Sequence, residues 1–146
     1  MITTHAPAPK AMLTRQVSLT PVPPQPPHRR RIVVVEDDPD RSAHLAAALR
    51  DDGHDVVVES DGAVALRRVV ELTPEIVMVD LGMLPHRNGF EILADVQALG
   101  LSTRTIGMTG SQAPQFETRA RELGAVGLLR KPVAPETARV LVGQLH

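Results

Sequence analysis

Apolar and polar residues follow one another in blocks along most of this chain, and the blocks are of two kinds. Short runs of β-branched and other apolar residues, such as residues 32–35 and 76–79, are typical of strands that are buried on both faces. Longer stretches carry apolar residues three or four positions apart, as at Ala65, Val69 and Leu72, which is typical of helices. The two kinds of block alternate from residue 31 onward.

This alternation predicts five strand–helix pairs. The strands are expected at residues 32–35, 55–59, 76–79, 103–109 and 126–129, and the helices at about residues 40–51, 61–72, 89–99, 111–124 and 134–145. Pro39 and Asp61 mark helix starts, and Ser111 is expected to begin the fourth helix. The first helix should turn Ala43, Ala47 and Leu49, or their neighbours, toward the core. Strict alternation implies an α/β fold with a parallel sheet covered by helices on both faces.

Polar side chains stand at the ends of four predicted strands, where each apolar run stops. They are Glu36, Asp37 and Asp38 after the first strand, Asp80 after the third run, Thr109 at the end of the fourth strand, and Lys131 after the fifth. Because the carboxyl ends of parallel strands meet at one edge of the sheet, we expect these groups to converge. Taken singly they have ordinary explanations: Asp80 could cap the next segment, Thr109 could be a β-branched strand residue, and Lys131 could be a solvated charge.

Together these groups predict a particular chemistry. Crowded carboxylates are unfavourable without a cation, and Mg²⁺ prefers such oxygen ligands. A hydroxyl and an ammonium suit the oxygens of a phosphoryl group, and a carboxylate can itself accept that group. The pattern therefore predicts a site that places a phosphoryl group on a carboxylate.

Composition removes several other classes of function. Apolar residues make up 42% of the 146 residues, enough for the core of one domain, but the only aromatic residues are two Phe. The absence of Cys excludes disulfides, thiolate metal sites and Cys nucleophiles. Neither a membrane-spanning stretch nor a signal peptide is recognisable, so we expect no membrane insertion and a cytoplasmic location.

Charge divides the chain in two. Residues 1–31 carry five Lys or Arg and no acid, whereas the remainder carries 11 Lys or Arg and all 17 Asp and Glu, a net charge of −6. Seven of the 13 prolines fall within residues 7–27. We expect residues 1–30 to be a disordered Pro-rich basic extension, either a passive leader or a docking segment, and residues 31–146 to be the folded domain. The acidic domain is not expected to bind nucleic acid directly.

Four motifs resemble the receiver domain of two-component response regulators. They are Val-Val-Val-Glu36-Asp37-Asp38, Val-Asp80, Met-Thr109-Gly and Leu-Arg-Lys131-Pro132. Each is common alone, but all four occur in the family's order at the ends of the right strands, and the resemblance covers residues 31–146. It implies a doubly wound, flavodoxin-like (βα)5 fold with strand order 2-1-3-4-5. It also implies Mg²⁺-dependent phosphorylation by a sensor histidine kinase or a phosphotransfer protein.

The resemblance also implies a role for each matched residue. Asp80 would be the phosphoacceptor, Thr109 the switch hydroxyl and Lys131 the partner of the phosphoryl group. Asp37 and Asp80 would bind Mg²⁺ directly, Glu36 through a water molecule, and Gly82 through its backbone carbonyl. The Lys131–Pro132 bond would be cis, and Asp38 would cap the following helix.

Two departures from the family pattern stand out. Pro85 follows Asp80 by five residues, one more than usual, so a bulge at residues 83–84 could absorb the insertion, or the ligand at Gly82 could move. Leu128 stands three residues before Lys131, where the family often has an aromatic side chain that moves on activation. Any coupling of Thr109 to the surface would then use aliphatic packing.

Three hypotheses follow. The first is a stand-alone receiver without an output domain, not an enzyme beyond its own phosphorylation and dephosphorylation, which signals to a downstream protein by contact. The second is a degenerate receiver that acts as a phosphorylation-independent binding module. The third is a flavodoxin-like cofactor protein, which would need a Ser/Thr-rich phosphate loop and aromatic residues that this chain lacks.

Overall fold

The computed structural model describes residues 28–82 and 86–145, and five strands alternate with five helices in them, as predicted. In chain order these are β1 (Arg31–Val35), α2 (Pro39–Asp51), β2 (Asp55–Glu59), α3 (Gly62–Leu72), β3 (Ile76–Asp80), α4 (Gly89–Ala98), β4 (Arg104–Thr109), α5 (Pro114–Glu122), β5 (Ala125–Arg130) and α6 (Pro135–Gln144). The predictions for residues 1–27 and for the loop residues 83–85 lie outside the described residues.

The strands form one parallel sheet in the order β2-β1-β3-β4-β5, which confirms the predicted topology. The register aligns Val35 of β1 with Val79 of β3, and Asp80 of β3 with Met108 of β4. At the far side, Thr109 of β4 is aligned with Arg130 of β5. The carboxyl ends of β1, β3, β4 and β5 therefore lie along one edge of the sheet.

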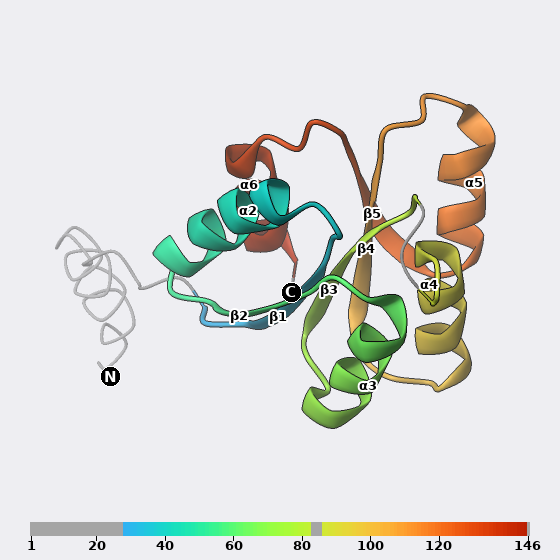
Figure 1. Cartoon of the computed structure of the whole chain (residues 1–146), viewed down its shortest axis with the longest axis horizontal. Helices are drawn as coiled ribbons and strands as arrows, with labels where there is room; N and C mark the ends of the chain where they lie inside the picture. The colour runs from blue at the N-terminus through green and yellow to red at the C-terminus, as the bar shows by residue number, and fades with distance from the viewer. Residues whose placement is uncertain (1–27, 83–85, 146) are drawn as a thin grey trace, which may run out of the picture.

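Helices cover both faces of this sheet. Figure 1 shows α2 and α6 packed together on one face and α3, α4 and α5 on the other. Successive residues of a strand point to opposite faces, so Ile32 and Val34 join the core under α2 and α6, while Val33 and Val35 join the core under the other three helices. Both cores are almost entirely aliphatic, as the composition predicted.

Two details of the helices differ from the sequence-based expectation. Helix α2 buries Leu49 as expected, but Ala43 and Ala47 are exposed. The rest of its buried face consists of Ser42, Leu45 and Ala46. Helix α5 begins at Pro114 rather than at Ser111, because the Ser111 side chain accepts a hydrogen bond from the Ala113 backbone amide, 3.1 Å away, and shapes a turn instead. Pro114 then occupies the first helical turn, where its missing N–H costs nothing.

The described residues just before β1 contact the edge of the sheet opposite the strand ends. The guanidinium of Arg29 is 2.6 Å from the Asp55 carboxylate, and the buried side chain of Arg30 donates to the backbone carbonyl of Leu145. The expected disordered extension lies mostly outside the described residues and stays a prediction.

Candidate functional site

Three carboxylates meet where β1 and β3 end. Glu36 and Asp37 follow β1 directly, and Asp80 is the last residue of β3. Glu36 and Asp80 are buried, whereas Asp37 is exposed, and their nearest oxygens all lie within 4.8 Å of one another. Parallel pairing of the two strands brings these groups together, as expected for strand ends on a common edge.

The ammonium of Lys131 enters this group from the loop after β5. Its Nζ atom is 2.8 Å from Oδ1 of Asp80 and 3.4 Å from Oε2 of Glu36. The Lys131 side chain is 15% exposed, so both ion pairs are largely shielded from solvent. The Lys131–Pro132 bond that precedes α6 is cis, which confirms the expectation drawn from the resemblance.

Burial controls the protonation of Glu36. Withdrawal from solvent raises the pKa of the Glu36 carboxyl, and the nearby Asp80 carboxylate raises it further. The Asp38 amide, which donates to Oε1 of Glu36 over 3.1 Å, and the Lys131 ammonium act in the opposite direction. The excess of carboxylates at this edge of the sheet therefore favours the binding of a proton or of another cation.

Thr109 lies at the end of β4, beside Lys131, which follows β5. It is 3% exposed, and its carbonyl accepts a hydrogen bond from the Lys131 amide over 2.8 Å. Its Oγ1 accepts from the amide of Ser111, 3.0 Å away. The side chain of Thr109 is therefore held at the sheet edge that carries the carboxylates.

The loop after β3 returns close to Asp80. The Gly82 amide donates to Oδ1 of Asp80 over 2.9 Å, so this residue adjoins the carboxylate, while a role for its carbonyl in metal binding stays a prediction. A Cβ on Gly89 would lie 2.0 Å from the Asp80 carbonyl oxygen, so only glycine allows α4 to start here. His86, near the end of this loop, contacts Asp61, the N-cap of α3.

The oxygens at this edge have the chemistry that a hard divalent cation requires. Glu36, Asp37 and Asp80 offer oxygen ligands only, and one buried ammonium leaves their combined negative charge incompletely balanced. Mg²⁺ is commonly held by one or two carboxylates together with water and phosphate oxygens. These residues therefore fit Mg²⁺.

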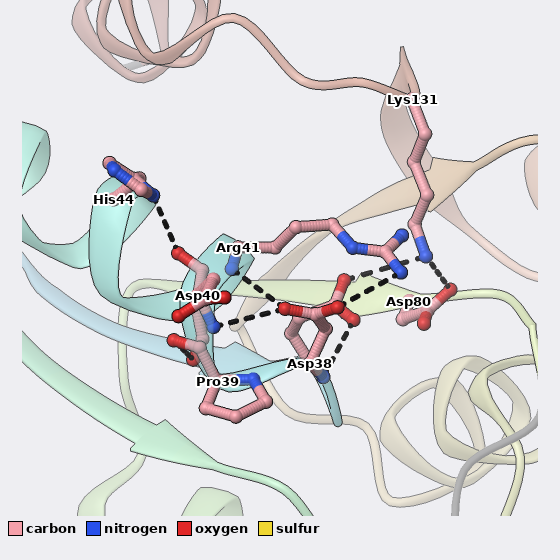
Figure 2. Close-up of polar contacts among 9 residues, drawn as sticks. Asp38, Pro39, Asp40, Arg41, His44, Asp80 and Lys131 are labelled. Atoms are coloured by element: carbon pink, nitrogen blue, oxygen red, sulfur yellow. Dashed lines mark hydrogen bonds and ion pairs between the residues drawn. The ribbon is translucent and has the colours of Figure 1, made fainter.

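Sequence reasoning missed one cation at this edge. Asp38 caps α2 as predicted, accepting from the amides of Asp40 and Arg41, and it also receives the Arg41 guanidinium. Figure 2 shows the Arg41 side chain extending from α2 toward the region of Lys131 and Asp80. The only signal in the sequence was the three-residue spacing of Asp38 and Arg41 at a helix start.

A strand order of 2-1-3-4-5 with clustered carboxylates and a lysine at the strand ends defines a receiver-type domain. The sequence matches the response regulator receiver domain family over residues 32–142, and the chain belongs to this family. The family is one of signalling domains rather than classical enzymes.

Several named proteins are similar to this chain. It is 31% identical over 95 residues to the transcriptional regulatory protein CiaR of Streptococcus pneumoniae. The matched stretch covers 65% of this chain and 42% of CiaR. It is 44% identical over 62 residues to the DNA-binding response regulator MtrA of Mycolicibacterium smegmatis, covering 42% of this chain and 27% of MtrA. The chain spans less than half the length of the curated relatives it matches.

A solved structure supports the same assignment. The signal receiver domain of a modulated diguanylate cyclase from Desulfovibrio desulfuricans G20 is 31% identical, with a TM-score of 0.70, covering 79% of this chain and 91% of that domain. Among the described helices of the present chain, none combines the length and apolar character needed to cross a bilayer.

Proposed function

We propose that Asp80 accepts a phosphoryl group, in a Mg²⁺-dependent reaction, from a sensor histidine kinase or a phosphotransfer protein. One observation carries this proposal: the Lys131 ammonium lies 2.8 Å from an oxygen of Asp80, and the carboxylates of Glu36 and Asp37 lie close to the same side chain. An isolated structural ion pair would not need two further carboxylates at the same edge, since they oppose one another unless a cation is added. Membership of the receiver family gives the proposal further support.

Besides Mg²⁺ and a donor, the reaction requires only groups that this edge of the sheet supplies. A carboxylate oxygen of Asp80 attacks the donor's phosphorus, and the P–N bond breaks with its electron pair passing to the imidazole nitrogen of the donor. Lys131 pairs with the phosphoryl oxygens, and the Thr109 hydroxyl donates to one of them, so that positioning and charge compensation do most of the work. Attack of water on phosphorus later breaks the bond between phosphorus and the Asp80 oxygen, which releases inorganic phosphate and restores the carboxylate. Gly82 and Ser111 would flank the path of this water.

Asp37 and Asp80 would hold Mg²⁺ directly, with the Gly82 carbonyl as a third ligand and Glu36 acting through a water molecule. When bound, the ion neutralises charge on the phosphoryl oxygens and on the attacking carboxylate.

Signalling would follow from the contact that Thr109 makes with the new phosphoryl group. Leu81 and Leu128 pack over the α-carbon of Gly107, two residues before Thr109, where a Cβ would lie 2.8 Å from Leu81 Cδ1 and 3.1 Å from Leu128 Cδ1. We propose that movement of Thr109 is transmitted through these leucines to a surface that contacts a downstream protein. We propose that the receiver domain comprises residues 31–146 and that it works in the cytoplasm, where a histidine kinase could act as the donor. Action without an attached output domain stays a prediction.

Intact-mass spectrometry tests the proposal directly. The full chain is incubated with an acyl phosphate and Mg²⁺, and one added phosphoryl group is expected, which disappears without Mg²⁺. Asp80→Asn should abolish the addition, and Asp40→Asn, which changes an exposed carboxylate on α2, should not. Wild-type protein that stays unmodified with both an acyl phosphate and a phosphohistidine donor would favour the phosphorylation-independent binding module instead.

A further inference from the structure

A cavity of about 250 Å³ opens beside the Lys131 ion pairs, between the start of α2 and the loop that leads into α6. Its polar lining includes Glu36, Arg41, His44 and Lys131, and its remaining wall is apolar. Two cationic side chains, one from α2 and one from the loop after β5, therefore face the same space next to the predicted phosphoacceptor.

Arg41 is held there only weakly. One of its guanidinium nitrogens lies 3.3 Å from Oδ2 of Asp38, the longer end of the hydrogen-bond range, and its side chain is 52% exposed. An exposed pair of this kind contributes little to stability, so the guanidinium is free to exchange partners at small cost.

The charges around Arg41 come from the site itself. The pKa of the Arg41 guanidinium is raised first by the Glu36 carboxylate and then by those of Asp38 and Asp80, although partial burial opposes them. Asp80 thus already acts on this arginine while it is unmodified. A phosphoryl group on Asp80 would add further negative charge on that side, with three oxygens for which the planar guanidinium is suited.

We propose that Arg41 is a second phosphoryl-binding cation of this site, which leaves Asp38 and donates hydrogen bonds to the phosphoryl oxygens on Asp80 together with Lys131. This inference rests on the proposed phosphorylation of Asp80. In the unmodified protein the Arg41 guanidinium pairs with Asp38, and its transfer from Asp38 to the phosphoryl group is part of phosphoryl recognition.

Beryllofluoride, which mimics a phosphoryl group on an aspartate, provides the test. Its affinity is measured by ¹⁹F NMR at saturating Mg²⁺, together with the rate of phosphorylation by an acyl phosphate. Arg41→Gln should weaken beryllofluoride binding by roughly 5- to 20-fold, the range expected for a partly exposed charge-assisted hydrogen bond. Arg41→Lys, which keeps the charge but not the planar fork, should give an intermediate affinity.

The matched control is Arg139→Gln. Arg139 binds Asp52, which caps the other end of α2, so both arginines pair with a cap carboxylate of the same helix. Equal beryllofluoride affinities in Arg41→Gln and Arg139→Gln would overturn the inference. Wild-type protein that neither binds beryllofluoride nor accepts a phosphoryl group would instead overturn the proposed function.

Asp38→Asn supplies a test in the opposite direction. Asparagine still caps α2 through its side-chain oxygen, but it no longer holds the guanidinium by charge. Beryllofluoride affinity should therefore rise, and the rise should disappear in the double variant with Arg41→Gln. A rise of equal size in both backgrounds would mean that Asp38 acts on the anion directly and not through Arg41.

Discussion

Lys131 compensates two buried carboxylates, so its replacement by methionine should reveal how strongly the site depends on a cation. The side chains of Asp80 and Glu36 are 5% and 3% exposed, and each faces the Lys131 ammonium. Methionine keeps the length and the apolar part of the side chain but removes the charge. Two buried carboxylates then oppose one another across the space that the ammonium filled.

The expected cost lies at the lower end of the range for a broken buried ion pair, about 3 kcal/mol. The reason is that the backbone amides of Gly82 and Asp38 still donate to Asp80 and Glu36, respectively, and keep part of their charge solvated. For a domain of this size, that loss corresponds to a fall in Tm of about 10 °C.

The loss should depend on pH. Without the ammonium, the pKa of Glu36 in the folded state, already raised, rises further above its value in the unfolded chain. The folded state then binds a proton more tightly than the unfolded state, so the destabilisation should be largest near about pH 8 and shrink as the pH falls toward about 5.

Urea unfolding followed by far-UV circular dichroism measures the effect, since the chain has neither Trp nor Tyr. The buffer contains a chelator, because a divalent cation would take over the role of the ammonium. Lys131→Met with Asp80→Asn should recover at least half of the lost stability. A loss below about 0.5 kcal/mol at about pH 8, or one that is independent of pH, would refute the assignment of Lys131 as the buried counter-charge.

Three further predictions concern stability and metal binding. Burial lowers the pKa of His54, whose Nδ1 accepts a hydrogen bond from the Arg30 amide, so the stability of the wild type should fall as the pH drops below about 6.5. His54→Asn keeps an acceptor but does not titrate, so urea titrations at two pH values should show a weaker pH dependence for this variant. Gly89→Ala should destabilise by about 1–3 kcal/mol because its Cβ would meet the Asp80 carbonyl, whereas Gly143→Ala, with open space around it, should stabilise by up to about 1 kcal/mol; equal Tm values would contradict this. Mg²⁺ at 100 times its Kd should stabilise the wild type by about 2.7 kcal/mol, and a chelator should reverse this stabilisation. The same Mg²⁺ concentration should stabilise Asp37→Asn far less, and equal stabilisation of both proteins would exclude Asp37 as a ligand.

Several features of the fold and the site could be predicted because they depend on local pattern. The apolar runs before Glu36 and Asp80 mark strands, and strict alternation with helices makes those strands parallel. In a parallel sheet all carboxyl ends share an edge, so the convergence of Glu36, Asp37 and Asp80 followed from the order of elements alone. The cap at Asp38 is equally local, because its partners are the amides two and three residues ahead.

Other features could not be predicted because several local solutions compete. Ser111 was predicted to start a helix because serine is a common N-cap. Its hydroxyl instead accepts a hydrogen bond from the Ala113 amide in a turn, and the helix begins at Pro114. The α2 sequence offers an alanine on almost every face, so periodicity could not decide between Ala43 and Ser42 as the buried position. Contact with the sheet and with α6 decided it.

The sequence by itself determined the order of the elements, the edge of the sheet that carries the acids, and the family, because these follow from short-range periodicity and from motifs at strand ends. Tertiary structure alone decided that the Lys131 ammonium bonds both Asp80 and Glu36, and that Arg41 faces the same cavity. The physical reason is that Lys and Arg side chains are long and flexible, so the electrostatic field of the surrounding charges determines which acidic group each of them contacts. Those charges come from elements that are distant in the chain, and they lie close together only after the sheet has formed.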